Sequence, residues 1–159
     1  MKTTNLILIL MAVISLMSCG QLHVVTLYVD TTQIDQSSID QHANFGQRDG
    51  IANKDFITNV RRGDKIIWQG VSTSNPLDTV KITSIDHVSG AKIFERKLSI
   101  LYPKSLTKMP GFVKELFAGK IIMKPGNLQQ YIEEEYSLDF TVTNKGTFQI
   151  DPVMRAYRK

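Results

Sequence analysis

Polar and apolar residues alternate over much of the chain, a pattern typical of β-strands that have one face in a core. The clearest alternation lies near the C-terminus and places apolar side chains at every second position: Tyr136, Leu138, Phe140 and Val142. Asn144-Lys145-Gly146 follows, and both Asn and Gly tolerate the positive φ that tight turns require. Residues 147–150 would form the returning strand, so the segment predicts a β-hairpin. Asp151-Pro152 marks its end.

The rest of the chain carries further strand signals, which predict seven or eight short strands in all. Residues 22–30 are rich in β-branched and aromatic side chains on both faces, as expected of a strand well inside a sandwich. Arg61-Arg62-Gly63-Asp64 is predicted to be a turn between two strands, residues 56–60 and 65–69. The remaining predicted strands are residues 79–86, 92–95, 98–102 and 121–123. Short strands with a turn about every 8–12 residues predict an all-β fold, an antiparallel β-sandwich with Ig-like or cupredoxin-like Greek-key connections.

Two longer connections, residues 31–54 and 103–119, separate groups of these strands. The second contains Lys114–Phe117 between Pro110-Gly111 and Gly119, and we expect the one short helix of the fold there. The sequence does not decide whether the two connections form a pocket, and it assigns no binding residues.

The N-terminus has the pattern of an export signal. Residues 6–17 are apolar except for Ser15 and follow a start that carries one positive charge, Lys2. This run is shorter than the about 20 residues that span a bilayer, but it fits the h-region of a signal peptide. Leu16-Met17-Ser18-Cys19 resembles a lipobox, in which the cysteine thiol accepts diacylglycerol before the signal is removed.

Cys19 is the only cysteine, so it has no partner for a disulfide within the chain, and lipidation gives this thiol a purpose. The alternative is an ordinary signal peptide followed by a cysteine present by chance. We expect residues 1–18 to be the signal peptide, residues 19–21 the lipidated anchor and residues 22–159 a single β-sandwich domain. The protein would then lie in the cell envelope, attached to the inner or outer membrane through acyl chains on Cys19 and facing the periplasm or the cell surface.

The net charge of +4 does not indicate a nucleic-acid partner. Lys2 leaves with the signal peptide, and the remaining surplus equals the three cations at the C-terminus, Arg155, Arg158 and Lys159. Nucleic-acid-binding proteins instead concentrate basic residues on a face or along a helix. We predict a solvated tail; contact of its cations with anionic lipid headgroups is the alternative.

One local motif has family resemblances. Residues 60–68 fit V-x-x-G-D-x-I-x-W, which resembles the turn and strand of cupredoxin-like sandwiches, with Ile66 and Trp68 entering the core. Cupredoxins hold copper with two histidines, a cysteine and usually a methionine. The only cysteine here lies in the anchor, so the sequence excludes a type-1 copper site.

The chain also resembles bacterial inclusion-body proteins of the PixA/AidA type over roughly residues 22–90. The resemblance rests on the opening strand that ends in Val29-Asp30-Thr31, on the G-D-x-I-x-W segment, and on the polar loop before residues 78–85. Residues 146–152 resemble the ending of small uncharacterised Gram-negative lipoproteins. These resemblances imply a β-sandwich and supply no catalytic residue to transfer. The lipobox sets this chain apart from the intracellular inclusion-body proteins.

The residues that could carry chemistry predict no active site. His23, His42 and His87 are too scattered to predict a metal site, and we expect His87 to be solvated at a strand end. The acidic run 133–135 lacks the interspersed residues of a calcium loop and is predicted to be a solvated edge. No G-x-S-x-G motif is present, and Trp68 is predicted to be a core residue rather than a platform for sugars.

We therefore predict no catalytic residues, no metal and no cofactor. The expected function is that of a non-catalytic envelope module that binds a protein, a glycan or the lipid surface through its loops. The alternative is an envelope enzyme, of a hydrolase type, that acts on glycan or peptide material.

Overall fold

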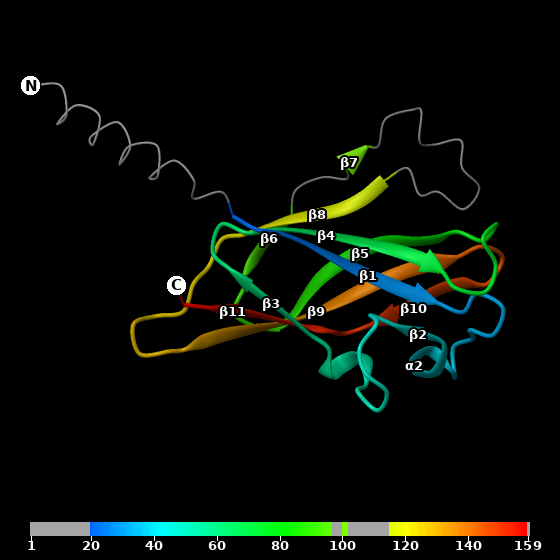
Figure 1. The fold of residues 1–159 in the computed structure, drawn as a ribbon, viewed down its shortest axis with the longest axis horizontal. Helices are drawn as coiled ribbons and strands as arrows, with labels where there is room; N and C mark the ends of the chain where they lie inside the picture. Colours follow the sequence, from blue (N-terminus) through cyan, green and yellow to red (C-terminus); the bar gives the residue numbers. More distant parts are fainter. Residues whose placement is uncertain (1–19, 97–99, 102–114, 159) are drawn as a thin grey trace, which may run out of the picture.

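The computed structural model describes residues 20–96, 100–101 and 115–158. Within these ranges the chain forms two β-sheets that lie one over the other (Figure 1). Cys19, the predicted signal peptide and most of the predicted loop 103–119 lie outside the described residues. None of the helices in the described part of the chain is long and apolar enough to cross a membrane.

The first sheet contains β1 (Leu22–Val29), β2 (Ala43–Asn44), β4 (Lys65–Ser72), β6 (Phe94–Arg96), β7 (Ile100–Leu101) and β8 (Glu115–Ile121). Its order is β2-β1-β4-β8-β6, and β7 also pairs with β8. β1 and β4 run parallel along their whole lengths, from the pair Leu22 and Lys65 to the pair Val29 and Ser72.

The second sheet contains β3 (Ile57–Arg61), β5 (Val80–Gly90), β9 (Tyr131–Val142), β10 (Gly146–Ile150) and β11 (Val153–Tyr157). β9 is its centre, because it pairs with β5, β10 and β11. β3 lies at the edge and runs parallel to β11. The predicted hairpin is confirmed as β9 and β10, and Asn144 in its turn has a φ of 60°.

The prediction of an all-β sandwich is confirmed, but its sheets are mixed rather than purely antiparallel. The turn Arg61–Asp64 explains the parallel pairs, since it does not close a hairpin. It carries the chain from β3 in one sheet to β4 in the other, and each strand then pairs with a distant segment. A local turn motif predicts a reversal of direction but not the sheet that the next strand joins.

The helix predicted at Lys114–Phe117 is wrong for the part that the structure describes. Glu115 to Phe117 belong to strand β8, where Phe117 lies opposite Trp68 on β4. Pairing with two strands at once outweighs the weak helical preference of a four-residue segment. The described helical turns lie instead in the first long connection, as α2 (Ile39–His42) and the 3-10 turn η1 (Asn53–Asp55).

The core lies between the sheets, and its centre is aromatic. Trp68 of β4 is 1% exposed, and its ring centroid lies 5.2 Å from that of Phe94 and 5.9 Å from that of Tyr136. Its indole N–H donates a hydrogen bond to the Tyr136 hydroxyl across the sandwich, at 3.1 Å. The prediction that Ile66 and Trp68 enter the core is confirmed, and two phenylalanines of the last hairpin lie in the same core. The residues concerned, all buried in one cluster, are Ile66, Trp68, Phe140 and Phe148.

Candidate functional site

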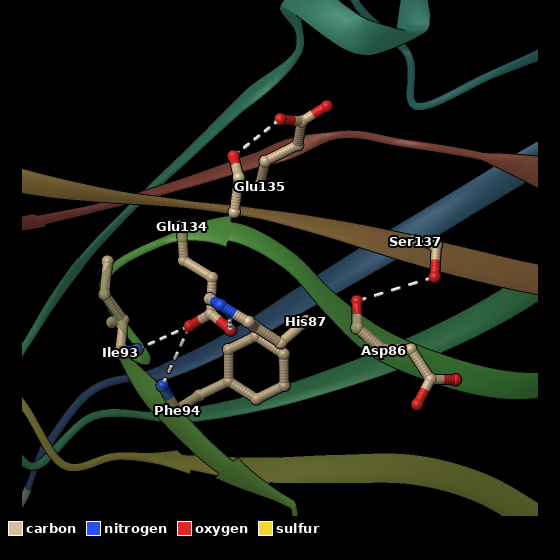
Figure 2. A network of polar contacts seen from close by, with 8 residues as sticks. Asp86, His87, Ile93, Phe94, Glu134, Glu135 and Ser137 are labelled. Carbon is tan, nitrogen blue, oxygen red and sulfur yellow. Dashed lines mark hydrogen bonds and ion pairs between the residues drawn. The ribbon is translucent and has the colours of Figure 1, made fainter.

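A buried carboxylate, Glu134, is the centre of the polar network in Figure 2. Glu134 occupies an inward-facing position of β9, in line with Tyr136, and its side chain is only 2% exposed. One carboxylate oxygen accepts hydrogen bonds from the backbone N–H groups of Ile93 and Phe94. The other lies 2.9 Å from Nδ1 of His87 on β5. The group therefore joins β9, β5 and the start of β6.

This network holds the chain where it crosses between the sheets. β5 belongs to one sheet and β6 to the other, and Gly90 begins the crossing with a φ of +81°. A Cβ on Gly90 would lie 2.4 Å from the carbonyl oxygen of Glu133, so only glycine fits there. The buried Ile93 and Phe94 N–H groups need an acceptor, because a buried donor without one is costly. Glu134 supplies it.

His87, predicted to be solvated at a strand end, lies within β5, and its side chain is 28% exposed. The solvated edge predicted for residues 133–135 is wrong at Glu134. Strand alternation explains the error, since the middle of three consecutive residues faces the opposite side from its neighbours. Glu133 and Glu135 face outward, where Glu133 pairs with Arg155 at 2.6 Å and Glu135 accepts a hydrogen bond from Ser89 at 2.8 Å.

The geometry around Glu134 is that of a structural clamp. Its two oxygens are both committed to donors from β5 and the β6 start. Of the nearby serines, Ser137 donates to the backbone carbonyl of Asp86 at 3.5 Å, and Ser89 donates to Glu135 (Figure 2). Each of these hydroxyls thus donates to an acceptor other than the His87 ring, whereas a nucleophilic serine donates to its base.

A second histidine–carboxylate pair lies at the start of β1. Nε2 of His23 lies 2.8 Å from Asp64 of the β3–β4 turn. Asp64 also accepts hydrogen bonds from the backbone N–H groups of Gln21 and Arg61. Burial raises the pKa of this carboxyl, but the hydrogen bonds from His23, Arg61 and Gln21 outweigh burial and hold the pKa below its usual value. The Gly-Asp pair of the sequence motif thus fixes β1 to the turn.

A groove of about 480 Å³ opens beside this pair, and its lining includes Asn59, Arg61 and Tyr157. A second groove, of about 520 Å³, lies in the connection predicted as a loop at residues 31–54. Its walls are residues 36–41 around α2, Asn53-Lys54 and residues 149–151 of the last hairpin. The first long connection therefore lines a concave surface, whereas residues 102–114 of the other lie outside the described part.

The Asp-Thr pair at the end of β1 is also structural. Thr31 is 1% exposed, and its hydroxyl donates to Asp78 at 2.7 Å and lies 2.8 Å from the Ser72 hydroxyl. Hydrogen bonds from Thr32 and Ser74 lower the pKa of Asp30 to about 2. These contacts tie the end of β1 to the loop between β4 and β5. The end of the opening strand and the polar loop before residues 78–85, which carried the resemblance to the PixA/AidA type, therefore hold each other in place.

The C-terminal residues were predicted as a solvated tail, and this is wrong for residues 153–157. They form β11, which lies between β9 and β3, with Met154 and Ala156 fully buried. Arg155 pairs with Glu133 and lies 4.5 Å from the centre of the Tyr131 ring. The alternation of apolar residues after Pro152 was the sequence signal for this strand. The basic residues within and after the strand led to the prediction of a solvated tail instead.

The absence of a bound metal ion stays a prediction. Among the described residues no group of three or more histidines, cysteines or carboxylates is arranged to hold a metal ion. His23 and His87 each pair with a separate carboxylate. We expect elemental analysis of protein purified without a histidine tag to find no stoichiometric zinc or copper. Metal that survives dialysis and is lost in His87→Ala would contradict this.

Comparison with known proteins places the chain in a fold class. No family model and no curated protein matches the sequence. Among solved structures, the chain is similar to the PixA inclusion body protein of Burkholderia cenocepacia, with a TM-score of 0.55 and 16% identity. The match covers 91% of this chain and 99% of that chain. The chain therefore has the β-sandwich fold of PixA, and the resemblance predicted from the sequence is confirmed at the level of the fold.

Proposed function

We propose that the protein is a lipid-anchored module of the cell envelope that has no catalytic activity and binds a protein or glycan partner. Acyl chains on Cys19 would attach it to the membrane, and the β-sandwich would present its loops to the partner. The export signal followed by Ser18-Cys19 is the observation that carries the first half of this proposal.

The position of the first strand supports the anchor. β1 begins at Leu22, and the two residues before it are already held by the domain. The N–H of Gln21 donates to Asp64, and the carbonyl of Gln21 accepts from the N–H of Lys65 at 2.8 Å. Gly20 lies so close to the turn that a Cβ would approach the Gly63 carbonyl oxygen. A cleavage before Cys19 would therefore remove the signal and leave the domain whole.

The structural roles of the buried polar groups support the proposal of a non-catalytic module. Both histidine–carboxylate pairs fasten one segment of the fold to another. The groove beside α2 is lined by polar side chains on short, surface-exposed segments, which suits recognition of a polar partner.

Replacement of the cysteine tests the anchor. We expect Cys19→Ser to move the protein out of washed membranes or to leave the signal uncut, because serine accepts no thioether-linked lipid. Two or three acyl chains at about 0.8 kcal/mol per buried CH₂ make a firm attachment. Cell fractionation and the mass of the mature protein are the measurements. Ser18→Ala keeps a small residue before the cysteine and should fractionate like the wild type. A Cys19→Ser protein that behaves the same way would disprove the anchor.

A further inference from the structure

One end of the sandwich, at which β1 starts, brings several segments together, and we call it the anchor-proximal end (Figure 1). It consists of the start of β1, the β3–β4 turn, residues 121–131 and the end of β11. Backbone hydrogen bonds join these segments. They run from the N–H of Lys65 to Gln21, from Gly63 to Ile121 and from Arg158 to Gln130.

Basic side chains gather on this end, although they are scattered in the sequence. The exposed cations are Arg61, Arg62, Lys65, Lys120, Lys124 and Arg158. Lys65 and Lys120 lie directly opposite each other on β4 and β8, an arrangement that like charges make unfavourable. Glu95 on β6 lies on the other side of Lys120, while Asp64 is turned inward to His23. The surface therefore has a surplus of positive charge.

Large apolar side chains are exposed among these cations. They are Leu22, Ile122, Met123, Leu128 and Tyr131. Leu128, in the loop between β8 and β9, is 101% exposed and thus makes no shielding contact with the described part of the domain. Exposed apolar residues with interspersed cations are the composition of surfaces that lie at a membrane interface.

The opposite end of the sandwich has the reverse charge. The connection after β1 and the loop between β4 and β5 meet there, and they carry Asp30, Asp35 and Asp78. Lys145, in the β9–β10 turn at this end, donates to the carbonyl of Thr32. The two ends of the domain therefore carry opposite charge, and the basic end is the one at which β1 starts.

We propose that the anchor-proximal end docks directly on an anionic bilayer, with the loop 126–130 at headgroup depth. The proposal rests on the proposed function, since acyl chains on Cys19 bring this end to the membrane. Three residue steps separate Cys19 from Leu22, so the first strand starts within about 10 Å of the lipidated residue. Because Gly20 and Gln21 are fixed to the β3–β4 turn, the tether leaves the domain little freedom to turn over. The acidic end with the Asp30 and Asp78 loops then faces away from the membrane.

Tryptophan quenching by brominated lipids tests this orientation. The lipidated protein carrying Leu128→Trp is reconstituted into vesicles of phosphatidylethanolamine and phosphatidylglycerol whose acyl chains are brominated near the headgroup. We expect the added tryptophan to lose most of its emission relative to vesicles without bromine. Leu77→Trp, at a 68% exposed leucine of the opposite end, is the matched control and should lose none. Trp68, buried in the core, gives the same background in both proteins.

Charge reversal tests whether the basic residues attract this end of the domain to anionic lipid. Arg62→Glu with Lys124→Glu should lower the quenching at position 128 and its dependence on phosphatidylglycerol. Arg48→Glu with Lys54→Glu makes the same change in net charge away from this end and should leave both unchanged. Raised salt should weaken the phosphatidylglycerol effect, because it screens exposed charges.

The mass of the mature protein shows whether Cys19 is acylated, and so distinguishes a failure of the docking proposal from a failure of the proposed lipid anchor. Equal quenching at positions 77 and 128, or none at 128, in protein whose Cys19 is acylated would overturn the docking surface and leave the anchor standing. Protein without acyl chains would overturn the proposed function and the docking surface together.

Discussion

Trp68→Ala should lower the free energy of unfolding of the domain by about 3–5 kcal/mol, the cost typical of removing a large aromatic side chain from a core. The indole packs between the rings of Phe94 and Tyr136 and touches both sheets, so alanine would leave a cavity where the sandwich is held together. The substitution also removes the donor to the buried Tyr136 hydroxyl. Such a loss is a large part of the total stability of a small domain.

Denaturant melts of residues 20–159 measure this effect by far-UV circular dichroism, since Trp68 is the only tryptophan and its fluorescence is lost in the variant. Trp68→Phe keeps a ring and should cost about 1–2 kcal/mol, because the hydrogen bond to Tyr136 ends. Tyr28→Ala removes an exposed aromatic from the neighbouring strand and should cost under about 1 kcal/mol. Equal losses for Trp68→Ala and Tyr28→Ala would show that Trp68 does not fill the core.

The strands could be predicted from the sequence because alternation is a local property. The hairpin of β9 and β10, strands β1 and β4, and the core positions Ile66 and Trp68 were all predicted. The pairing of strands that are distant in the sequence could not be predicted. β1 and β4 are separated by the whole first connection, and no local signal indicates that they lie side by side and parallel.

The errors at β8 and β11 have one physical origin. Each segment is short and includes charged and small residues, so its local signal for a strand is weak. β8 is a strand because β4 and β6 flank it, and β11 because β9 and β3 do. Tertiary pairing, which the sequence alone does not reveal, decides such segments.

The polar clamps were missed because they depend on register. His87 and Glu134 are far apart in sequence, and they meet only because β5 lies beside β9 and the chain crosses sheets after Gly90. The predicted alternation places position 134 on the same face as Tyr136, but an acidic side chain is rarely buried, so this signal was not used. The exposed cations of the anchor-proximal end were hidden in the same way, because they come from separate strands and turns.

Glu134→Ala should destabilise the domain by about 3–5 kcal/mol, although the residue is one of three adjacent glutamates. The variant leaves the buried N–H groups of Ile93 and Phe94 without an acceptor, at a cost of about 1–3 kcal/mol for each buried donor. His87 loses its partner at the same time. A space would also open next to Tyr136, which is fully buried.

Two variants separate the clamp from a general loss of stability. Glu135→Ala removes a neighbouring, partly exposed glutamate whose side chain accepts a hydrogen bond from Ser89, and it should cost under about 1 kcal/mol. Glu134→Gln keeps one oxygen acceptor for the crossover, and its amide can donate to the His87 ring. Its cost should therefore be well below that of Glu134→Ala.

Amide hydrogen exchange gives the specific readout under native conditions. In Glu134→Ala the Ile93 and Phe94 amides should exchange faster than the amides of the other strands in both sheets, because the crossover opens locally before the domain unfolds. In Glu135→Ala their protection should stay that of the wild type. If Glu134→Ala and Glu135→Ala cost the same and leave Ile93 equally protected, then the buried carboxylate does not hold the two sheets in register at the crossover.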